Sequence, residues 1–388
     1  MNFNDLEKAF ASKSDADLKS DYRLFKILGQ KWLVDIAPPL TDMALKLHLP
    51  IKRIIRATVF KHFCGGEFIE DCEKTVNDLY KYKIGSILDY SAEGEEKEES
   101  FDYTAKEIIA TIHRAKGDPA IPFCVFKPTG IARFALLEKA SASADLSAEE
   151  TEEFKKAAAR FKNICAAAAE NNVRIFIDAE ESWIQKAIDD LAAQMMQLFN
   201  SQKVIVYNTI QLYRTDRLAF LKKSFEHAEK NNYFLGLKLV RGAYMEKERA
   251  RAEKLKYPSP IQPDKQSCDR DFDEALRFCV EHFDRIAICS GTHNEESNML
   301  LSQLMKEKNI PGNHPHIYFS QLLGMSDHIS YNLAAAGYNV SKYVPYGPVK
   351  SVLPYLRRRA QENTSIAGQM GRELSLITAE RNRRKSLK

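Results

Sequence analysis

The sequence lacks the features of several common protein classes. Its seven cysteines are odd in number and contain no C-x-x-C pair, which argues against a disulfide framework or a zinc ribbon and favours a reducing compartment. No stretch approaches the roughly 18 uncharged apolar residues needed to cross a bilayer. The net charge is only +4, so nucleic-acid binding, which usually needs a concentrated basic surface, is not expected.

Glycine is missing from one informative pattern. No two of the 16 glycines are separated by a single residue, so the sequence contains no G-x-G-x-x-G. A doubly wound sheet that binds a dinucleotide normally carries this loop after its first strand. If the chain binds a dinucleotide, we therefore expect another kind of loop to hold it.

What is present indicates one large domain with an appendage. Hydrophobic residues make up 44% of the 388 residues, enough for a substantial core. Up to residue 83, apolar residues recur at roughly helical spacing, prolines interrupt them, and no strand-like run occurs. We expect an N-terminal helical arm over 1–83, a main domain over 84–370 and a basic tail over 371–388.

Short apolar runs alternate with amphipathic stretches from residue 84 onward. Almost continuous apolar runs are typical of parallel strands covered on both faces, and strand–helix alternation is typical of βαβ units. Helices are expected over 181–199, 213–231, 269–283 and 294–308. Eight units predict a closed (βα)8 barrel, with a doubly wound sheet as the alternative. The predicted strands span 84–91, 121–127, 173–180, 204–211, 234–244, 286–293, 316–324 and 339–347.

Three segments look like surface or chain ends. The acidic run over 93–99 is expected to be a solvated loop. The basic residues 381–388 are expected to form a frayed end, with attraction to an anionic membrane surface as the alternative. The first ten residues contain Asp5 and Glu7 and no apolar core, unlike a signal peptide or a typical presequence. This start favours a bacterial cytoplasmic protein, or a mitochondrial matrix protein if the source is eukaryotic.

In a barrel of this type the active site lies at the C-terminal ends of the strands. Polar or aromatic residues follow most of the predicted strands. They are Lys127, Asp178, Glu180, Glu181, Gln211, Arg241, Tyr244, Thr292, His293, Asn294, Gln321, Tyr343 and Tyr346. No cysteine or carboxylate lies at ligand spacing from His314 and His316, and no histidine partners the acidic segment after residue 177, so we expect no metal site.

The segment PYLRRRAQENTS, residues 354–365, is the sharpest local feature. Pro354 suits the first turn of a helix, on which Tyr355, Arg358 and Arg359 share one face. Two adjacent guanidinium groups need anions, and a carboxylate or phosphate ligand fits their planar forks. The alternative is a solvated basic face with Arg357 pointing elsewhere. Similarly, KLVRGAY over 238–244 indicates either a close approach to a ligand or an ordinary turn.

Six motifs in order carry a resemblance. An IDAEE strand end, KLVRGAY, THN, QLLGM, KYVPYGP and PYLRRRAQENTS together resemble the proline dehydrogenase family over roughly residues 80–370, most of all its monofunctional branch, which includes the mitochondrial enzymes. The resemblance implies a distorted (βα)8 barrel with a final helix over its mouth. It also implies FAD bound without a Rossmann loop.

The resemblance also implies roles for individual residues. The substrate carboxylate is expected to pair with Lys127, Arg358 and Arg359, with Asp178 in the same pocket. Leu239, Tyr244, Tyr343 and Tyr355 are expected to surround the substrate ring. Lys238 stands where the bifunctional branch commonly has Arg, and Ser320 where it has Gln. The residues expected to bind FAD are Gln211, Lys238, Arg241, Gly242, Thr292, His293, Asn294, Gln321, Leu322 and Glu362.

The implied reaction is oxidation of L-proline to 1-pyrroline-5-carboxylate by hydride transfer to the flavin, with a membrane quinone as electron acceptor and a peripheral membrane contact. No second catalytic domain is expected, so a separate pyrroline-5-carboxylate dehydrogenase would take the product. No general base is evident, which favours proton loss to solvent. Three alternatives stay open: a hydroxyproline dehydrogenase, which the bulk of Tyr343 disfavours, a flavin-free lyase with Lys127 as Schiff base, and a basic binding module.

Overall fold

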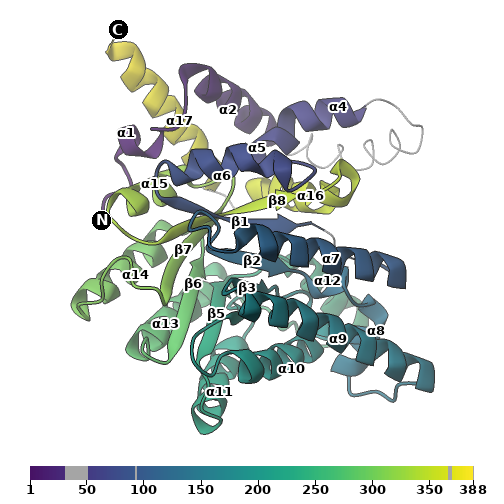
Figure 1. Ribbon diagram of the computed structural model, residues 1–388. Coiled ribbons are helices and arrows are strands. Elements are labelled where there is room, and N and C mark those ends of the chain that lie inside the picture. Colours follow the sequence, from purple (N-terminus) through teal and green to yellow (C-terminus); the bar gives the residue numbers. More distant parts are fainter. Residues whose placement is uncertain (31–50, 92–93, 366–368, 388) are drawn as a thin grey trace.

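Eight parallel strands form a closed barrel in chain order (Figure 1). This computed structural model describes residues 1–30, 51–91, 94–365 and 369–387. Each predicted strand segment contains one strand, which confirms the (βα)8 barrel and makes the doubly wound alternative wrong. The strands are β1 Ile84–Tyr90, β2 Phe123–Phe126, β3 Arg174–Ile177, β4 Val206–Gln211, β5 Leu235–Val240, β6 Ile286–Gly291, β7 Ile317–Leu322 and β8 Val340–Tyr346.

Aromatic side chains fill part of the barrel interior. The rings of Phe123 and Phe176 stack with centroids 4.4 Å apart, and Tyr207 meets both edge-on at 5.5 and 5.4 Å. All three are essentially inaccessible to solvent. The interior is therefore packed rather than hollow, as is usual in this architecture, and the chemistry is left to the strand ends.

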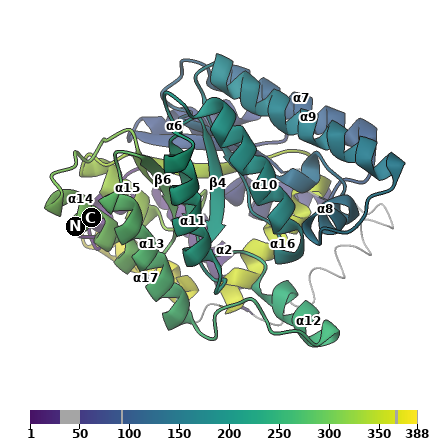
Figure 2. The same ribbon diagram turned by 90° about the horizontal axis from the view of Figure 1, so that it is seen from below.

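Helices cover the outer face of the barrel; Figure 2 shows α10, α11 and α13 over β4 and β6. The predicted helices correspond to α10, α11, α13 and α14. Helix α13 begins four residues earlier than predicted because Asp264 caps it, accepting a hydrogen bond from the Ser267 amide. The helices of the barrel are α7 Glu98–Ala115, η3 Pro128–Gly130, α8 Phe134–Ser141, α9 Ala148–Glu170, α10 Ser182–Phe199, α11 Arg217–Lys230, α12 Met245–Leu255, α13 Lys265–Glu281, α14 Glu295–Glu307, α15 Asp327–Ala335 and α16 Val349–Ser365.

The N-terminal arm is helical where it is described, as predicted; the predicted arm residues 31–50 lie outside the described residues. Its elements are α1 Leu6–Ala9, α2 Asp15–Leu28, α4 Ile51–Ile55, the π-helix η1 Arg56–Phe60, α5 Lys61–Phe63, the 3-10 turn η2 Glu70–Cys72 and α6 Glu73–Tyr80. Within the described chain, no helix combines the length and apolar character that crossing a membrane requires.

The C-terminal tail does not fray, so that prediction was wrong. Residues Gln369–Ser386 form helix α17, which lies beside α1 and α2 in Figure 1. Arg383 and Arg384 both pair with Glu380, which is fully buried, and Arg384 also donates to the Phe10 carbonyl at 3.0 Å. These internal ion pairs hold the basic end of the chain against the arm.

A second hydrophobic core joins the two ends of the chain to the barrel. It contains side chains from α2, α5, α16 and α17, together with Met325 from the turn after β7. Phe25, Phe63 and Leu376 are buried in it. The arm and α17 are therefore packed parts of the structure at one side of the barrel.

Candidate active site

Four charged side chains and a tyrosine meet at the ends of five strands. Lys127 donates to both carboxylate oxygens of Asp89, at 3.0 and 2.9 Å, and lies 3.8 Å from Asp178. Lys238 donates to Asp178 and, at 2.6 Å, to the hydroxyl of Tyr343. The Tyr343 hydroxyl in turn lies 3.2 Å from Asp178. We call these five residues the strand-end cluster.

Burial dominates the electrostatics of the strand-end cluster. Burial raises the pKa of Asp89, while the Lys127 ammonium opposes this shift. Burial, reinforced by the charge of Asp178, raises the pKa of Tyr343 well above its ordinary value. Lys238 also lies 4.8 Å from the Tyr343 ring centroid. The cluster therefore sets each lysine against a carboxyl group and keeps Tyr343 neutral as a hydrogen-bond donor.

Helix α16 brings the predicted aromatic and guanidinium groups together. The Arg359 guanidinium lies 5.2 Å from the Tyr355 ring centroid, and Arg358 lies 5.7 Å from that of Tyr244. Arg359 is only 6% exposed, so the alternative of a solvated basic face is wrong for it. A buried guanidinium is suited to a buried anion.

The start of α16 differs from the prediction. The helix begins at Val349, and Pro354 lies inside it rather than in its first turn. Pro348 precedes the helix, and its carbonyl accepts the amides of Ser351 and Val352 at 2.8 and 3.2 Å. Pro348, and not Pro354, therefore stands at the start of the helix.

Predicted cofactor residues at the ends of β5, β6 and β7 form a connected set. Arg241 donates to the Thr292 hydroxyl at 2.6 Å and to Asp269 at 2.8 Å. The Thr292 carbonyl accepts from the side chain of Gln321 at 3.1 Å. The side chain of Arg241 keeps 21% of its surface exposed, so part of it stays accessible to a ligand.

His293 lies buried beside this set. Its Nδ1 is 2.9 Å from the Ser326 hydroxyl. Burial, reinforced by the nearby charges of Lys342 and Arg359, holds the pKa of His293 well below its ordinary value, so the ring is neutral at pH 7. The neighbouring Asn294 caps α14 by accepting the Ser297 amide at 3.1 Å, so its side chain has a structural task.

Two features fit a flavin cofactor. The side-chain oxygen of Gln211 is buried and has no hydrogen-bond partner among the described residues, so it could accept from a flavin N–H. Gly242 has φ of +134°, and a Cβ there would lie 2.5 Å from the Tyr213 ring. Only glycine fits this position, so no side chain projects from the backbone beside Arg241. Bound at these residues, FAD would accept a hydride equivalent.

The remaining predicted residues are not linked to the strand-end cluster in the same way. Leu239 is fully buried in the main core, and Leu322 is half-buried. The side chain of Glu362 lies outside the described residues. Glu180 accepts from Thr129, and Glu181 pairs with Lys247. The described residues contain no group of three or more His, Cys, Asp or Glu that could hold a metal.

Sequence reasoning missed Asp89, Ser326 and Lys342. Asp89 stands near the end of β1, and its charge within an otherwise apolar strand was a usable signal. Lys342 is fully inaccessible to solvent and donates to Asp327 at 2.8 Å. Ser326 gave no signal, because its contact with His293 joins residues 33 positions apart.

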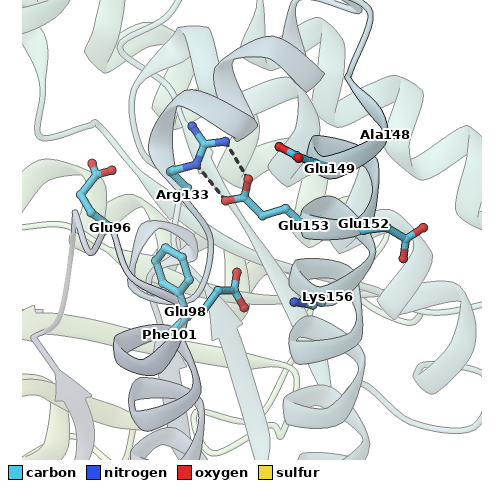
Figure 3. A pocket seen from close by; sticks show the side chains of 9 residues that line it. All are labelled: Glu96, Glu98, Phe101, Arg133, Ala148, Glu149, Glu152, Glu153 and Lys156. Atoms are coloured by element: carbon cyan, nitrogen blue, oxygen red, sulfur yellow. Dashed lines mark hydrogen bonds and ion pairs between the residues drawn. The ribbon is translucent and has the colours of Figure 1, made fainter.

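A separate pocket of about 570 Å³ lies on the outer wall (Figure 3). Glu96, Glu98 and Glu153 are among its lining residues, and Arg133 donates to Glu153 at 2.6 and 2.8 Å. Glu98 belongs to α7 and pairs with Arg160, so the predicted solvated loop ends at Lys97. This acidic pocket is distinct from the strand-end cluster.

A closed parallel barrel with charged strand ends defines a (βα)8-barrel enzyme. The profile of the family described as "Proline dehydrogenase" matches residues 72–372. The chain belongs to the proline dehydrogenase family.

Individual relatives agree with this family. The mitochondrial proline dehydrogenase 1 of Dictyostelium discoideum is 32% identical, over 98% of this chain and 74% of the relative. The carbapenem antibiotics biosynthesis protein CarD of Pectobacterium carotovorum is 33% identical, over 83% of each chain. The structure of proline utilization A (PutA) from Bdellovibrio bacteriovorus superposes with a TM-score of 0.73, covering 94% of this chain and 38% of that chain. At 20% identity, this likeness shows the fold alone.

Proposed function

We propose that this chain is an FAD-dependent L-proline dehydrogenase that forms 1-pyrroline-5-carboxylate and passes its electrons to a membrane quinone. The proposal is carried by the strand-end cluster of lysines and carboxylates, together with a buried arginine, Arg359, on α16, the helix that follows β8. Proline carries one carboxylate and one amine on an apolar ring. Guanidinium groups, acids and tyrosines at one barrel mouth suit that combination.

Each residue has a defined task in this proposal. Arg358 and Arg359 bind the substrate carboxylate, and Lys127 adds positive charge from β2. Tyr244, Tyr343 and Tyr355 flank the ring and exclude water. Asp178 keeps Lys238 and Tyr343 in place through its hydrogen bonds to both. The chain therefore supplies orientation, and the flavin supplies the redox chemistry.

The amine proton is released to solvent in this scheme. Asp89 accepts two hydrogen bonds from Lys127, and Asp178 accepts from Lys238 and Tyr343. Both carboxyl groups already accept hydrogen bonds from lysines, so this scheme assigns neither of them the role of general base. A residue-specific pKa in the rate–pH profile that a single substitution abolishes would contradict this.

The most direct test is optical. The purified protein should be yellow or become yellow with FAD, and L-proline should bleach the flavin absorbance under anaerobic conditions. A colourless protein that takes up no FAD would overturn the proposal. A flavoprotein that proline does not bleach would leave the cofactor correct and the substrate wrong.

Arg359→Ala tests the carboxylate role. The change removes one guanidinium from a buried site, so the Kd for proline should rise by about 100-fold, while FAD affinity changes by less than about threefold. Titration of flavin absorbance with proline and of apoprotein with FAD gives both values. Arg357→Ala, on the same helix, is the matched control and should alter proline binding much less.

Hydroxyproline is the alternative substrate, and Tyr343 discriminates. Tyr343 is buried and held by Lys238, so it cannot easily move away from a 4-hydroxyl group. We expect the parent enzyme to prefer proline and Tyr343→Ser to narrow the ratio of kcat/KM values by about tenfold or more. Equal turnover of both substrates by the parent enzyme would favour the alternative.

The Schiff-base alternative is disfavoured by Lys127 itself. A lysine nucleophile must be neutral, whereas Lys127 donates to both oxygens of a buried carboxylate. Such bidentate donation is typical of an ammonium group. A lasting covalent adduct after borohydride treatment with a carbonyl substrate would contradict this assignment.

The partners and location follow as parts of the same proposal. Quinone reduction would bring the enzyme to a membrane surface peripherally, and a separate pyrroline-5-carboxylate dehydrogenase would consume the product. Relatives with mitochondrial in their names are 32–33% identical over most of this chain. A bacterial cytoplasmic location stays a prediction.

A further inference from the structure

The turn that follows β7, residues 323–326, is an unusual piece of backbone. Gly324 and Ser326 both have positive φ, +76° and +51°. Ser326 is not glycine, so the surrounding structure must hold it in this conformation. The turn begins directly after Leu322, a predicted cofactor residue, and Ser326 contacts His293, another. Its conformation therefore bears on two residues of the proposed flavin site.

His62 of the N-terminal arm contacts this turn. The ring Nε2 of His62 lies 2.9 Å from the Gly324 carbonyl oxygen, and Nδ1 lies 3.0 Å from Asp21 on α2. Both partners are acceptors, so only the doubly protonated imidazolium satisfies both at once. The approach is close: a Cβ on Gly324 would lie 2.6 Å from the His62 carbonyl oxygen.

Helix α17 holds the other end of the turn through Glu373. Its carboxylate accepts the Ser326 amide at 2.6 Å, and the side chain is buried. Lys342 holds the turn from the barrel side, donating to the Met325 carbonyl at 2.5 Å and to Asp327. The turn therefore has one anchor in the barrel and two in the terminal segments of the chain.

We propose that His62 and Glu373 are positioning residues for the bound cofactor, acting through the turn 323–326. Both lie outside residues 72–372, the part of the chain that the family profile matches. The inference rests on the proposed function, since it takes the flavin site to include Leu322 and His293. It assigns the arm and α17 a task in cofactor binding.

A pair of polar substitutions at one position tests the arm contact. The amide nitrogen of glutamine reaches roughly where Nε2 lies, and that of asparagine roughly where Nδ1 lies. His62→Gln should therefore keep the bond to Gly324, while His62→Asn should lose it. We expect the Kd for FAD, measured by titrating apoprotein with FAD, to rise about tenfold in His62→Asn and less than about threefold in His62→Gln.

A second pair tests α17. Glu373→Gln keeps an oxygen acceptor for the Ser326 amide and should bind FAD nearly as the parent does. Glu373→Ala removes the acceptor and should weaken FAD about tenfold. The thermal unfolding midpoint of each apoprotein variant is measured as well. If the two residues had a purely structural role, the substitutions would lower this midpoint, but the two variants at one position would not differ in FAD affinity.

The outcomes separate the two proposals. Parent protein that does not bind FAD overturns the proposed function. Parent protein that binds FAD, with His62→Asn and Glu373→Ala binding it equally well, overturns the positioning role alone. Weaker FAD binding confined to those two variants, with their glutamine counterparts close to the parent, supports the positioning role.

Discussion

In the half of the barrel mouth formed by β1, β2, β3, β5 and β8, charged side chains pair directly with one another. In the half formed by β6 and β7, Gln321 and His293 bind a backbone carbonyl and a hydroxyl, and the one cation linked to them, Arg241, comes from the end of β5 and pairs with Asp269. The ion pair between Lys127 and Asp89 is an example from the first half. The hydrogen bond from Gln321 to the Thr292 carbonyl is an example from the second. The first half is held by charge between neighbouring strands. The second depends on the shape of the loops.

The two halves also differ in the contacts that hold them in place. The strand-end cluster stands on strands that pair along their length, so the barrel itself fixes it. The turn 323–326 is held by His62, 262 residues away in sequence, and by Glu373 on α17. Substitution of His62 should therefore alter the β6–β7 half more than the strand-end cluster.

The largest expected effect comes from breaking the buried Lys127–Asp89 pair. Lys127→Met leaves the Asp89 carboxylate without its cation, and both side chains are less than 10% exposed. We expect the free energy of unfolding in urea to fall by about 3–5 kcal/mol. FAD affinity should change little, because the β6–β7 half does not depend on this pair.

The double variant Asp89→Leu, Lys127→Met is the control. It replaces the ion pair with apolar groups of similar volume, so it should recover most of the lost stability. Proline oxidation should stay impaired, since the positive charge near the substrate is still missing. If Lys127→Met alone lowers the free energy of unfolding by less than about 1 kcal/mol, the ion pair does not stabilise the barrel mouth in this way.

The fold could be predicted because its signal is local. Runs such as FCVF in β2 are apolar throughout, and alternation with helices fixed both the parallel pairing and the strand number. The packing of α17 could not be predicted in this way. Its basic residues bind Glu380 on the same helix and carbonyls of the arm, and nothing in the local sequence identifies a distant carbonyl partner.

Part of the candidate active site could also be predicted from the sequence, because several of its residues stand at strand ends. Lys127, Asp178 and Tyr343 stand at strand ends, and their convergence follows from the barrel once the strands are placed. Asp89 was missed because it sits within β1 rather than after it. The positive φ of Ser326 had no signal at all, since it reflects anchors from α17 and the barrel rather than the residue itself.

Asp21 gives an intermediate effect that depends on pH. Burial would raise its pKa, but hydrogen bonding from His62 and the charge of Lys13 outweigh burial and lower the pKa to about 2, from 3.8. The Asp21 carboxylate binds a proton more readily in the unfolded chain than in the folded one. Ionised Asp21 therefore adds about 2 kcal/mol to the free energy of unfolding above pH 4, and this contribution is lost as the pH falls towards 2. The difference in unfolding free energy between the parent and Asp21→Asn should shrink accordingly, and a constant difference from pH 6 to pH 3 would contradict this.

The smallest effect should come from the outer end of α17. Arg384 pairs with Glu380 and Asp15 and donates to two carbonyls of the arm. Its loss should matter little because Asp15 is half-exposed. In addition, Arg383 still pairs with Glu380 when Arg384 is removed. Arg384→Ala should therefore lower the free energy of unfolding by about 1 kcal/mol or less and increase amide hydrogen exchange in α1. The control Lys385→Ala, at an exposed position, should change neither quantity. FAD affinity should be unaffected, because Glu373, three turns nearer the barrel, still holds the Ser326 amide. A loss of FAD affinity in Arg384→Ala equal to that in Glu373→Ala would mean that α17 acts as one rigid body, and that the contact at Ser326 has no separate part in shaping the β6–β7 half.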